Sequence, residues 1–287
     1  MHNINIINPK AGQGLAEKYI TDHDEVLMTK GVGDAERIAF DICNEKENVH
    51  LTVYGGDGTI NEAANGILKS KHADSAVLSA FPAGTGNDFL RIAKDEVVNC
   101  DVVKYNDRYF LNMFNIGFDC DVVIKTAKMK KKPFISGSMA YILSVAARFF
   151  QKFGQTMCVK AVDADGVEHN YKGEYLLCLI GNGSYYGGGF HSSPDSDITD
   201  GVMELIMVKK MSRLKFISLI GVYKKGEHIR DGKIIEKFRD YFTYIKCKHV
   251  EISQVNYYCV DGEIEYVQDK NKPITLDVVP SALKFQF

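Results

Sequence analysis

Short apolar runs alternate with helix-like stripes through the first third of the chain. Four runs of strand length occur there, at residues 4–7, 25–29, 49–54 and 76–81. The apolar positions between them recur with helical spacing, as in Ile60, Ala63, Ala64 and Ile67. Strands that alternate with helices are typical of a parallel sheet covered by helices. From residue 157 onward β-like runs dominate. The pattern predicts an α/β domain followed by a β-sandwich or β-barrel-like domain.

The third run ends in a glycine-rich stretch, Gly55-Gly56-Asp57-Gly58-Thr59-Ile60-Asn61-Glu62. Its last four residues fit a capping box, in which Thr59 caps the helix and Glu62 returns the hydrogen bond. Free N–H groups and the helix dipole at such a helix start favour a bound anion. A simple turn would need only one glycine. Three glycines around a carboxylate therefore favour a phosphate site.

Two more strands end in glycine loops, at Asn8-Pro9-Lys10-Ala11-Gly12 and at Gly84-Thr85-Gly86-Asn87-Asp88-Phe89. The first loop is not a Walker A sequence, because no Gly-Lys-Ser/Thr follows it. In parallel sheets the carboxyl ends of the strands share one edge, and ligands bind there. Three glycine loops at one edge favour a nucleotide-phosphate site over three unrelated turns.

Composition and charge narrow the class of protein. The 287 residues are 45% hydrophobic and 25% charged, which is ordinary for a globular chain of one large or two modest domains. A formal net charge of −2 gives no argument for a nucleic-acid partner, and we expect none. The opening residues lack the features of a signal peptide, and no apolar run reaches membrane-spanning length. Seven scattered cysteines without zinc spacing favour reduced thiols in the cytoplasm.

A basic stretch, residues 125–132, precedes a run at residues 139–150 that could form an amphipathic helix. Such a pair could touch anionic lipid headgroups as a peripheral membrane contact. A solvated surface run explains the same residues equally well. Both interpretations stay open, as does a homodimer.

The three glycine loops and a late Asp261-Gly262-Glu263, in this order and spacing, resemble the diacylglycerol kinase catalytic-domain family. That family holds soluble bacterial lipid kinases and the eukaryotic sphingosine and ceramide kinases. The glycine-aspartate block alone is shared with distant NAD kinases and phosphofructokinases. The Asn-Pro start, the Gly-Thr-x-Asn-Asp-Phe block and the Asp-Gly-Glu make the resemblance specific to the lipid kinases. Without it, Asp261-Gly262 would read as a hairpin turn only.

The resemblance implies an ATP site and its catalytic groups. Glu263 would be the general base with Asp261 beside it, and Asp57 would join a water-linked network with the nucleotide's Mg²⁺. The residues that would hold ATP are Asn8, Pro9, Lys10, Ala11, Gly12, Thr29, Gly55, Gly56, Asp57, Gly58, Thr59, Ile60, Asn61, Glu62 and Thr85.

The resemblance also implies a structural Mg²⁺ in the loop at residues 194–202. On that match Asp200 gives its side chain, while Asp197 and Val202 give main-chain oxygens, and oxygen ligands suit Mg²⁺. Two departures stand out: Thr199 replaces a second Asp of many bacterial members, and Ala11 replaces a frequent Ser. A plain acidic turn stays open as the alternative for the metal loop.

The resemblance predicts an ATP- and Mg²⁺-dependent lipid kinase, with diacylglycerol as the expected acceptor and phosphatidic acid as the product. A sphingoid base, ceramide or NAD stays open as another acceptor, and a non-catalytic nucleotide-binding regulator stays open as another class. We expect residues 1–105, completed by a strand at 280–287, to form the ATP-binding α/β domain. Residues 106–279 would form the β-sandwich that takes the lipid.

Overall fold

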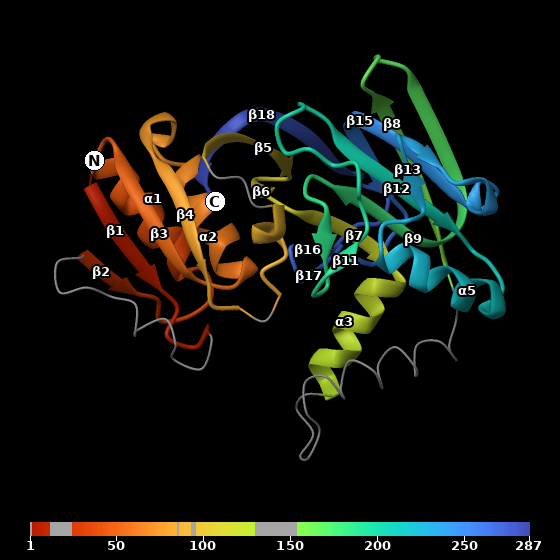
Figure 1. Ribbon diagram of the computed structural model, residues 1–287, viewed down its shortest axis with the longest axis horizontal. Coiled ribbons are helices and arrows are strands. Elements are labelled where there is room, and N and C mark those ends of the chain that lie inside the picture. The colour runs from red at the N-terminus through yellow and green to blue at the C-terminus, as the bar shows by residue number, and fades with distance from the viewer. Residues whose placement is uncertain (1, 12–24, 85, 93–95, 130–153) are drawn as a thin grey trace.

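The structure is a computed structural model that describes residues 2–11, 25–84, 86–92, 96–129 and 154–287. Side chains are described throughout these ranges except at residues 126–129. The expected helix at 139–150 and residues 130–132 of the basic stretch lie outside the described residues. Figure 1 shows two halves side by side, with the N-terminal strands and two helices in one and the later strands in the other.

A parallel sheet forms the centre of the N-terminal half. Its strands are β1 (His2–Ile7), β2 (Glu25–Met28), β3 (Val49–Gly55) and β4 (Val77–Pro82), in the order β2-β1-β3-β4. All three pairings are parallel, which confirms the α/β organisation predicted from the alternating runs. Helices α1 (Asp34–Glu45) and α2 (Asp57–Leu68) provide the crossovers. All three strands that precede glycine loops therefore end at the same edge.

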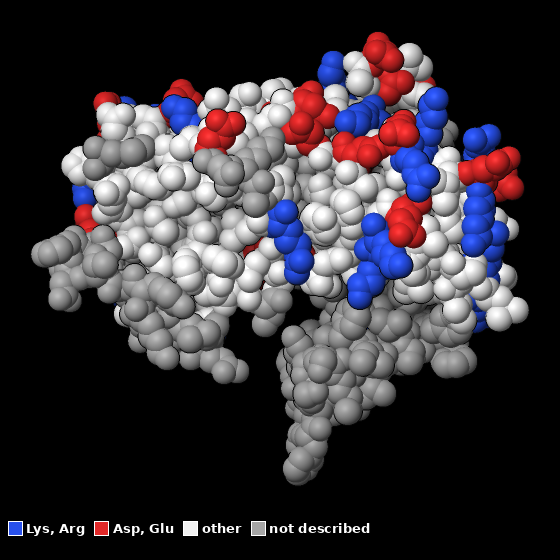
Figure 2. Space-filling view, viewed as in Figure 1, with Lys and Arg blue, Asp and Glu red and all other residues white. Residues whose placement is uncertain are grey.

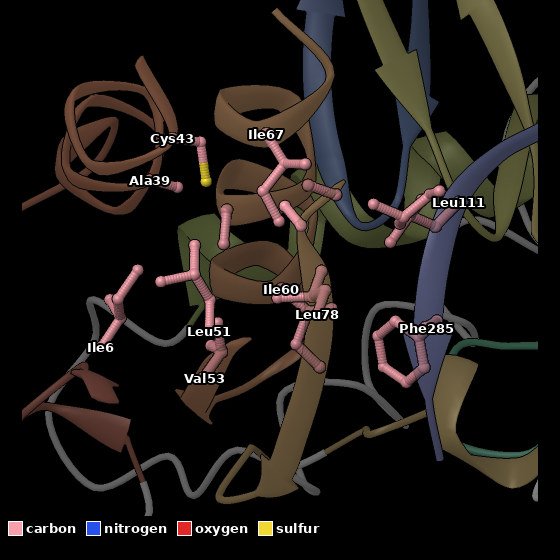
Figure 3. Close-up of a cluster of buried hydrophobic side chains, with 14 of the residues drawn as sticks. Ile6, Ala39, Cys43, Leu51, Val53, Ile60, Ile67, Leu78, Leu111 and Phe285 are labelled. Atoms are coloured by element: carbon pink, nitrogen blue, oxygen red, sulfur yellow. The ribbon is translucent and has the colours of Figure 1, made fainter. Parts of the chain in front are cut away.

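One hydrophobic core joins this sheet to its helices. Alternate residues of β3 are buried, as its period-2 pattern requires. Figure 3 shows Leu51, Val53 and Leu78 of the strands facing Ile60 and Ile67 of α2. These are the apolar positions of the predicted stripe, and they fix which side of α2 faces the sheet.

The C-terminal half is β-sandwich-like. Its main strands are β7 (Met113–Gly117), β8 (Gln155–Asp163), β9 (Glu168–Gly181), β12 (Met203–Lys209), β15 (Phe242–Ser253), β16 (Tyr257–Val260) and β17 (Glu263–Tyr266). β8 pairs with both β9 and β15, while β12 also lies between those two strands. The sheet therefore folds over itself around a second core of buried apolar residues.

Shorter elements complete this half. They are β10 (Tyr185–Tyr186), β11 (Phe190–His191), β13 (Ile229–Arg230), β14 (Lys233–Ile234), and the helices α3 (Phe118–Met129) and α5 (Arg213–Lys224). A 3-10 turn lies at Glu236–Phe238 in this half, and others lie earlier in the chain, at Ala73–Ser75 and Phe89–Ile92. The sequence pattern did not predict α3 or α5.

Two strands join the halves. β18 (Ile274–Gln286) pairs with β15 by its first residues and lies parallel to β4 by its last, at Lys284 to Gln286. β5 (Val97–Tyr105) runs antiparallel along β18, and β6 (Arg108–Phe110) pairs with β5. The sequence suggested a closing strand at 280–287, whereas in the structure residues 280–286 belong to the longer β18, which has an irregularity between Val279 and Leu283. The strands thus continue from one half into the other, as Figure 1 shows for β18.

Candidate active site

The three glycine loops meet at the carboxyl edge of the parallel sheet. The Asn8 backbone N–H donates to the Tyr54 carbonyl oxygen at 2.9 Å, and Asn8 Nδ2 donates to Thr59 Oγ1 at 3.1 Å. A Cβ on Gly84 would lie 2.5 Å from the Gly56 Cα, so these two loops touch backbone to backbone. Glycine is required at this contact because a side chain has no room there. The structure therefore brings the three loops into one site.

Helix α2 begins differently from the prediction. It starts at Asp57, with Gly56 as N-cap and no side-chain capping bond. The predicted capping box is therefore wrong, because both of its side chains bond elsewhere. Thr59 bonds Asn8 across the site, and Glu62 accepts hydrogen bonds from the Gly33 and Ala35 backbone N–H groups at 2.8 and 3.3 Å. Glu62 thus caps α1 instead of α2.

Two carboxylates face each other across the second and third loops. Asp57 Oδ1 accepts from the Phe89 backbone N–H at 3.2 Å, and Asp88 Oδ2 accepts from the Gly188 N–H at 2.8 Å. A Cβ on Gly86 would lie 2.9 Å from Asp57 Oδ2 and 3.4 Å from Asp88 Oδ2. Burial, and then the Asp57 charge, raise the pKa of Asp88, although the Gly188 N–H opposes this rise. Asp88 also forms an ion pair with Arg91, whose Nε lies 3.2 Å from Asp88 Oδ1, so Asp57 is the carboxylate of this pair that is left to face a hard cation with water ligands.

Asp261 links the two halves of the protein. Its Oδ2 accepts from Asn61 Nδ2 at 2.5 Å and from the Leu111 N–H at 3.0 Å. Its Oδ1 accepts from the Asn112 and Met113 N–H groups at 3.2 and 2.7 Å. Burial raises its pKa to about 6, while these N–H donors pull the pKa down. Four donors converge on one carboxylate, so its position is closely fixed.

Asn65 supports this link from one helical turn further along α2. Its Nδ2 donates to Asn61 Oδ1 at 2.5 Å and to the Tyr109 carbonyl oxygen at 2.8 Å, while its Oδ1 accepts from the Tyr109 N–H at 2.9 Å. Asn65 is fully buried. The sequence analysis did not single out Asn65 or assign a role to Asp88. A polar residue four positions after Asn61, beside the apolar stripe of α2, was the available signal for Asn65.

Glu263 lies on the solvent-exposed side of the site. It follows the tight turn at Asp261 and Gly262, whose φ angles are +44° and +91°, and it is the first residue of β17. Its side chain is exposed, and its Oε1 lies 3.9 Å from the position that a Cβ on Gly58 would take. Glu263 therefore reaches from the β half to the start of α2, next to Asp57.

The other predicted ATP residues lie around these groups. Lys10 and Ala11 donate their backbone N–H groups to Asn8 Oδ1 and O at 3.0 Å, which closes the first loop, with Pro9 in the same turn. Thr29 is buried and donates its N–H to Ile7 O at 2.8 Å. The Ile60 side chain lies in the core, so only its backbone could reach a nucleotide. Gly12 and Thr85 lie outside the described residues.

A close approach of β3 and α2 explains Gly55. A Cβ there would lie 2.6 Å from the Thr59 Cβ. The glycine lets the helix start directly after the strand, so the N–H groups of its first turn open onto the loops.

In the predicted metal loop, the ammonium group of a lysine lies next to the acidic residues. Lys246 Nζ donates to Asp200 Oδ2 at 2.8 Å and to the Asp195 carbonyl oxygen at 3.2 Å. Asp200 Oδ1 accepts from the Val202 N–H, and Asp197 Oδ1 accepts from the Thr199 hydroxyl. In the part of the chain that the structure describes, no three His, Cys, Asp or Glu side chains gather as a metal site. As arranged, this loop does not fit a structural Mg²⁺, because the Lys246 ammonium already neutralises Asp200.

Comparisons with known proteins agree with this geometry. The family model "Diacylglycerol kinase catalytic domain" matches residues 2–104, and "YegS C-terminal NAD kinase beta sandwich-like domain" matches residues 113–287. No helix within the described ranges is both long and apolar enough to cross a membrane.

Similar proteins align along most of the chain. A diacylglycerol kinase of Staphylococcus aureus (strain Newman) is 30% identical over 290 residues, covering 90% of this chain and 84% of the relative. A diacylglycerol kinase of Staphylococcus carnosus (strain TM300) is 28% identical, covering 91% and 87%. A solved structure from Bacillus anthracis str. Sterne superposes with a TM-score of 0.73 at 25% identity, covering 99% and 96%. The chain belongs to the diacylglycerol kinase catalytic-domain family of lipid kinases, for which ATP is the phosphate donor.

Proposed function

We propose that this protein transfers the γ-phosphoryl group of ATP to the free hydroxyl of a lipid alcohol, with diacylglycerol as acceptor and phosphatidic acid as product. The observation that carries the proposal is the contact between halves at Asp261. Its bond to Asn61 at 2.5 Å fixes the β16–β17 turn against α2, and the same turn carries Glu263 to the start of that helix. A carboxylate from the lipid half is thereby held over the phosphate loops.

Different groups of the site have different roles in phosphoryl transfer. Backbone N–H groups of the glycine loops and the first turn of α2 position the phosphates of ATP. Glu263 accepts the hydroxyl proton of the lipid as that oxygen bonds to the γ-phosphorus, while the bond from the γ-phosphorus to the bridging oxygen breaks and ADP leaves. The exposed position of Glu263 leaves it open to the incoming hydroxyl.

Asp57 and Asp88 are the residues that would hold a Mg²⁺ brought in with ATP, through water ligands. When bound, this ion would neutralise charge on the β- and γ-phosphates. Burial, and then the Asp57 charge, raise the pKa of Asp88, while the Gly188 N–H and Arg91 lower it, and a cation between the two carboxylates would relieve the repulsion that remains.

Replacing Glu263 by glutamine tests the base. We expect transfer from radiolabelled ATP to fall about 100-fold or more, since general base catalysis contributes about 10²–10⁴-fold. Calorimetric binding of a non-hydrolysable ATP analogue should stay nearly unchanged. Glu168→Gln, at the exposed start of β9, is the matched control and should keep full activity. Full turnover by Glu263→Gln would remove Glu263 from the mechanism.

A panel of acceptors tests the substrate. Diacylglycerol, a sphingoid base, ceramide and NAD would each be offered with radiolabelled ATP in mixed micelles. We expect the label in phosphatidic acid. Labelling of another acceptor would replace diacylglycerol, and ATP binding without transfer to any of them would favour a non-catalytic regulator. A cytoplasmic location with peripheral membrane contact belongs to the same proposal.

A further inference from the structure

Helix α5 is apolar on two opposite faces. One face packs on the protein through Phe216, Leu219 and Tyr223, which are spaced as one side of a helix. On the other face Leu214 is 82% exposed and Ile217 is 56% exposed. Helices on a protein surface normally turn polar residues outward, so two large apolar side chains one turn apart on the solvent side need an explanation.

Basic residues dominate the sequence around these two side chains, where Lys210 is paired with Glu174 at 2.7 Å and Glu227 follows Gly226. From Lys209 to Gly226 the chain carries six basic residues and no acidic one, although the whole protein has a net charge of −2. Helical spacing puts the exposed Ser218, Gly221 and Lys224 on the same side as Leu214 and Ile217, and Lys225 follows at the C-cap. In Figure 2 Lys and Arg side chains, with fewer Asp and Glu side chains among them, lie on the side of the molecule where Figure 1 has α5.

The packing of α5 ties this face to the lipid half of the site. Phe216 contacts Phe118, the first residue of α3, with ring centroids 5.0 Å apart. α3 follows β7 directly, and the first residue of β7, Met113, donates to Asp261 at 2.7 Å. The outward face of α5 therefore belongs to the same half of the protein as Glu263.

We propose that the outward face of α5 docks on an anionic lipid surface, with Leu214 and Ile217 entering the acyl boundary and Lys224 and Lys225 contacting phosphate headgroups. Apolar side chains flanked by cations are the combination that such a surface recognises. The inference rests on the proposed function, because a lipid acceptor dissolved in a bilayer requires the enzyme to reach that bilayer.

Sedimentation with vesicles of phosphatidylglycerol and phosphatidylcholine tests the docking. We expect wild-type protein to bind these vesicles, to release them at high salt, and to bind pure phosphatidylcholine weakly. Leu214→Glu/Ile217→Glu should bind at least tenfold more weakly. Val97→Glu/Val167→Glu is the matched control, since it places the same two charges at exposed apolar positions away from α5 and should bind like wild type.

A separate double variant tests the basic residues. Lys224→Ala/Lys225→Ala should weaken binding about 25-fold at low salt, at about fivefold for each charge removed. The proposal fails if Leu214→Glu/Ile217→Glu binds vesicles as well as the control double variant. It also fails if, without vesicles, analytical ultracentrifugation shows that this variant breaks up a wild-type oligomer, because a second copy would then cover α5.

Activity assays separate this inference from the proposed function. With a short-chain diacylglycerol in solution, Leu214→Glu/Ile217→Glu should transfer phosphate as fast as wild type, and with vesicles it should be at least tenfold slower. Loss of transfer to the dissolved substrate as well would refute a docking role for α5. If wild-type protein phosphorylates no lipid yet binds anionic vesicles through α5, the proposed function is refuted and the docking proposal is supported.

Discussion

Asparagine in place of Asp261 tests the link between the halves most directly. The substitution keeps the size of the side chain and tolerates the left-handed backbone at this residue. Asparagine has one acceptor oxygen where aspartate has two, so its NH2 group would face two of the four N–H donors. If the oxygen stays with Asn112 and Met113, the donors left unsatisfied are Asn61 Nδ2 and the Leu111 N–H.

The structure gives a magnitude for this loss. An unsatisfied buried donor costs about 1–3 kcal/mol, so two of them should lower the free energy of unfolding by about 2–6 kcal/mol. Phosphate transfer should fall as well, because the turn that carries Glu263 would no longer be fixed against α2. Nucleotide affinity should change less, since the glycine loops belong to the other half.

Urea unfolding followed by circular dichroism measures the stability in a chain that lacks tryptophan. Glu263→Gln, two residues away and exposed, is the matched control, and its free energy of unfolding should stay within about 0.5 kcal/mol of wild type. The reasoning is refuted if Asp261→Asn is as stable as Glu263→Gln, because the two hydrogen bonds that the substitution removes would then contribute nothing to holding the halves together.

Three further predictions concern the loops, the pH response and the metal loop. Gly84→Ala should abolish binding of an ATP analogue in calorimetry, because the added Cβ would lie 2.5 Å from the Gly56 Cα. Gly58→Ala should fold normally, because the atom nearest to its added Cβ would be 3.9 Å away. Burial lowers the pKa of His228 to about 4, so unfolded chains take up a proton first as the pH falls. His228 should therefore contribute a loss of about 3 kcal/mol to the free energy of unfolding between pH 6.5 and 4. The difference between wild type and His228→Gln in urea titrations measures this contribution, because Asp261, whose pKa is raised to about 6, acts in the opposite direction in both proteins. Lys246→Met should lower the melting temperature, and added Mg²⁺ should then raise the melting temperature of this variant. EDTA should leave the wild-type melting temperature unchanged. A wild-type melting temperature that falls in EDTA would contradict this interpretation of the loop.

The sequence pattern predicted the strands of the parallel sheet and the meeting of their glycine loops. This worked because β3 alternates buried and part-buried residues, so its period is visible without knowledge of its neighbours. The start of α2 could not be predicted the same way. Thr59 and Glu62 fit a local capping rule, yet each bonds a residue distant in sequence, and only the folded arrangement decides between the two partners.

Two features that the sequence did not predict, helix α5 and the hydrogen-bond donors of Asp261, have the same kind of cause. Helix α5 is apolar on both faces, so its sequence lacks the one-sided stripe that indicates a surface helix. The donors to Asp261 include the backbone N–H groups of residues 111–113, which are about 150 positions away and carry no sequence signature. The resemblance placed Asp261 beside Glu263, but its role in joining the halves emerges only from the fold.

The course of β18 has a consequence for how the protein is made. The nucleotide half needs residues 284–286 beside β4, yet these are the last residues of the described strands to leave the ribosome. Until then the edge of β4 stays unpaired and could join another chain. The phosphate loops at the ends of β3 and β4 therefore gain their full support only once synthesis has reached β18. The sheet of the N-terminal half is therefore completed only after the sequence of the other half has been made.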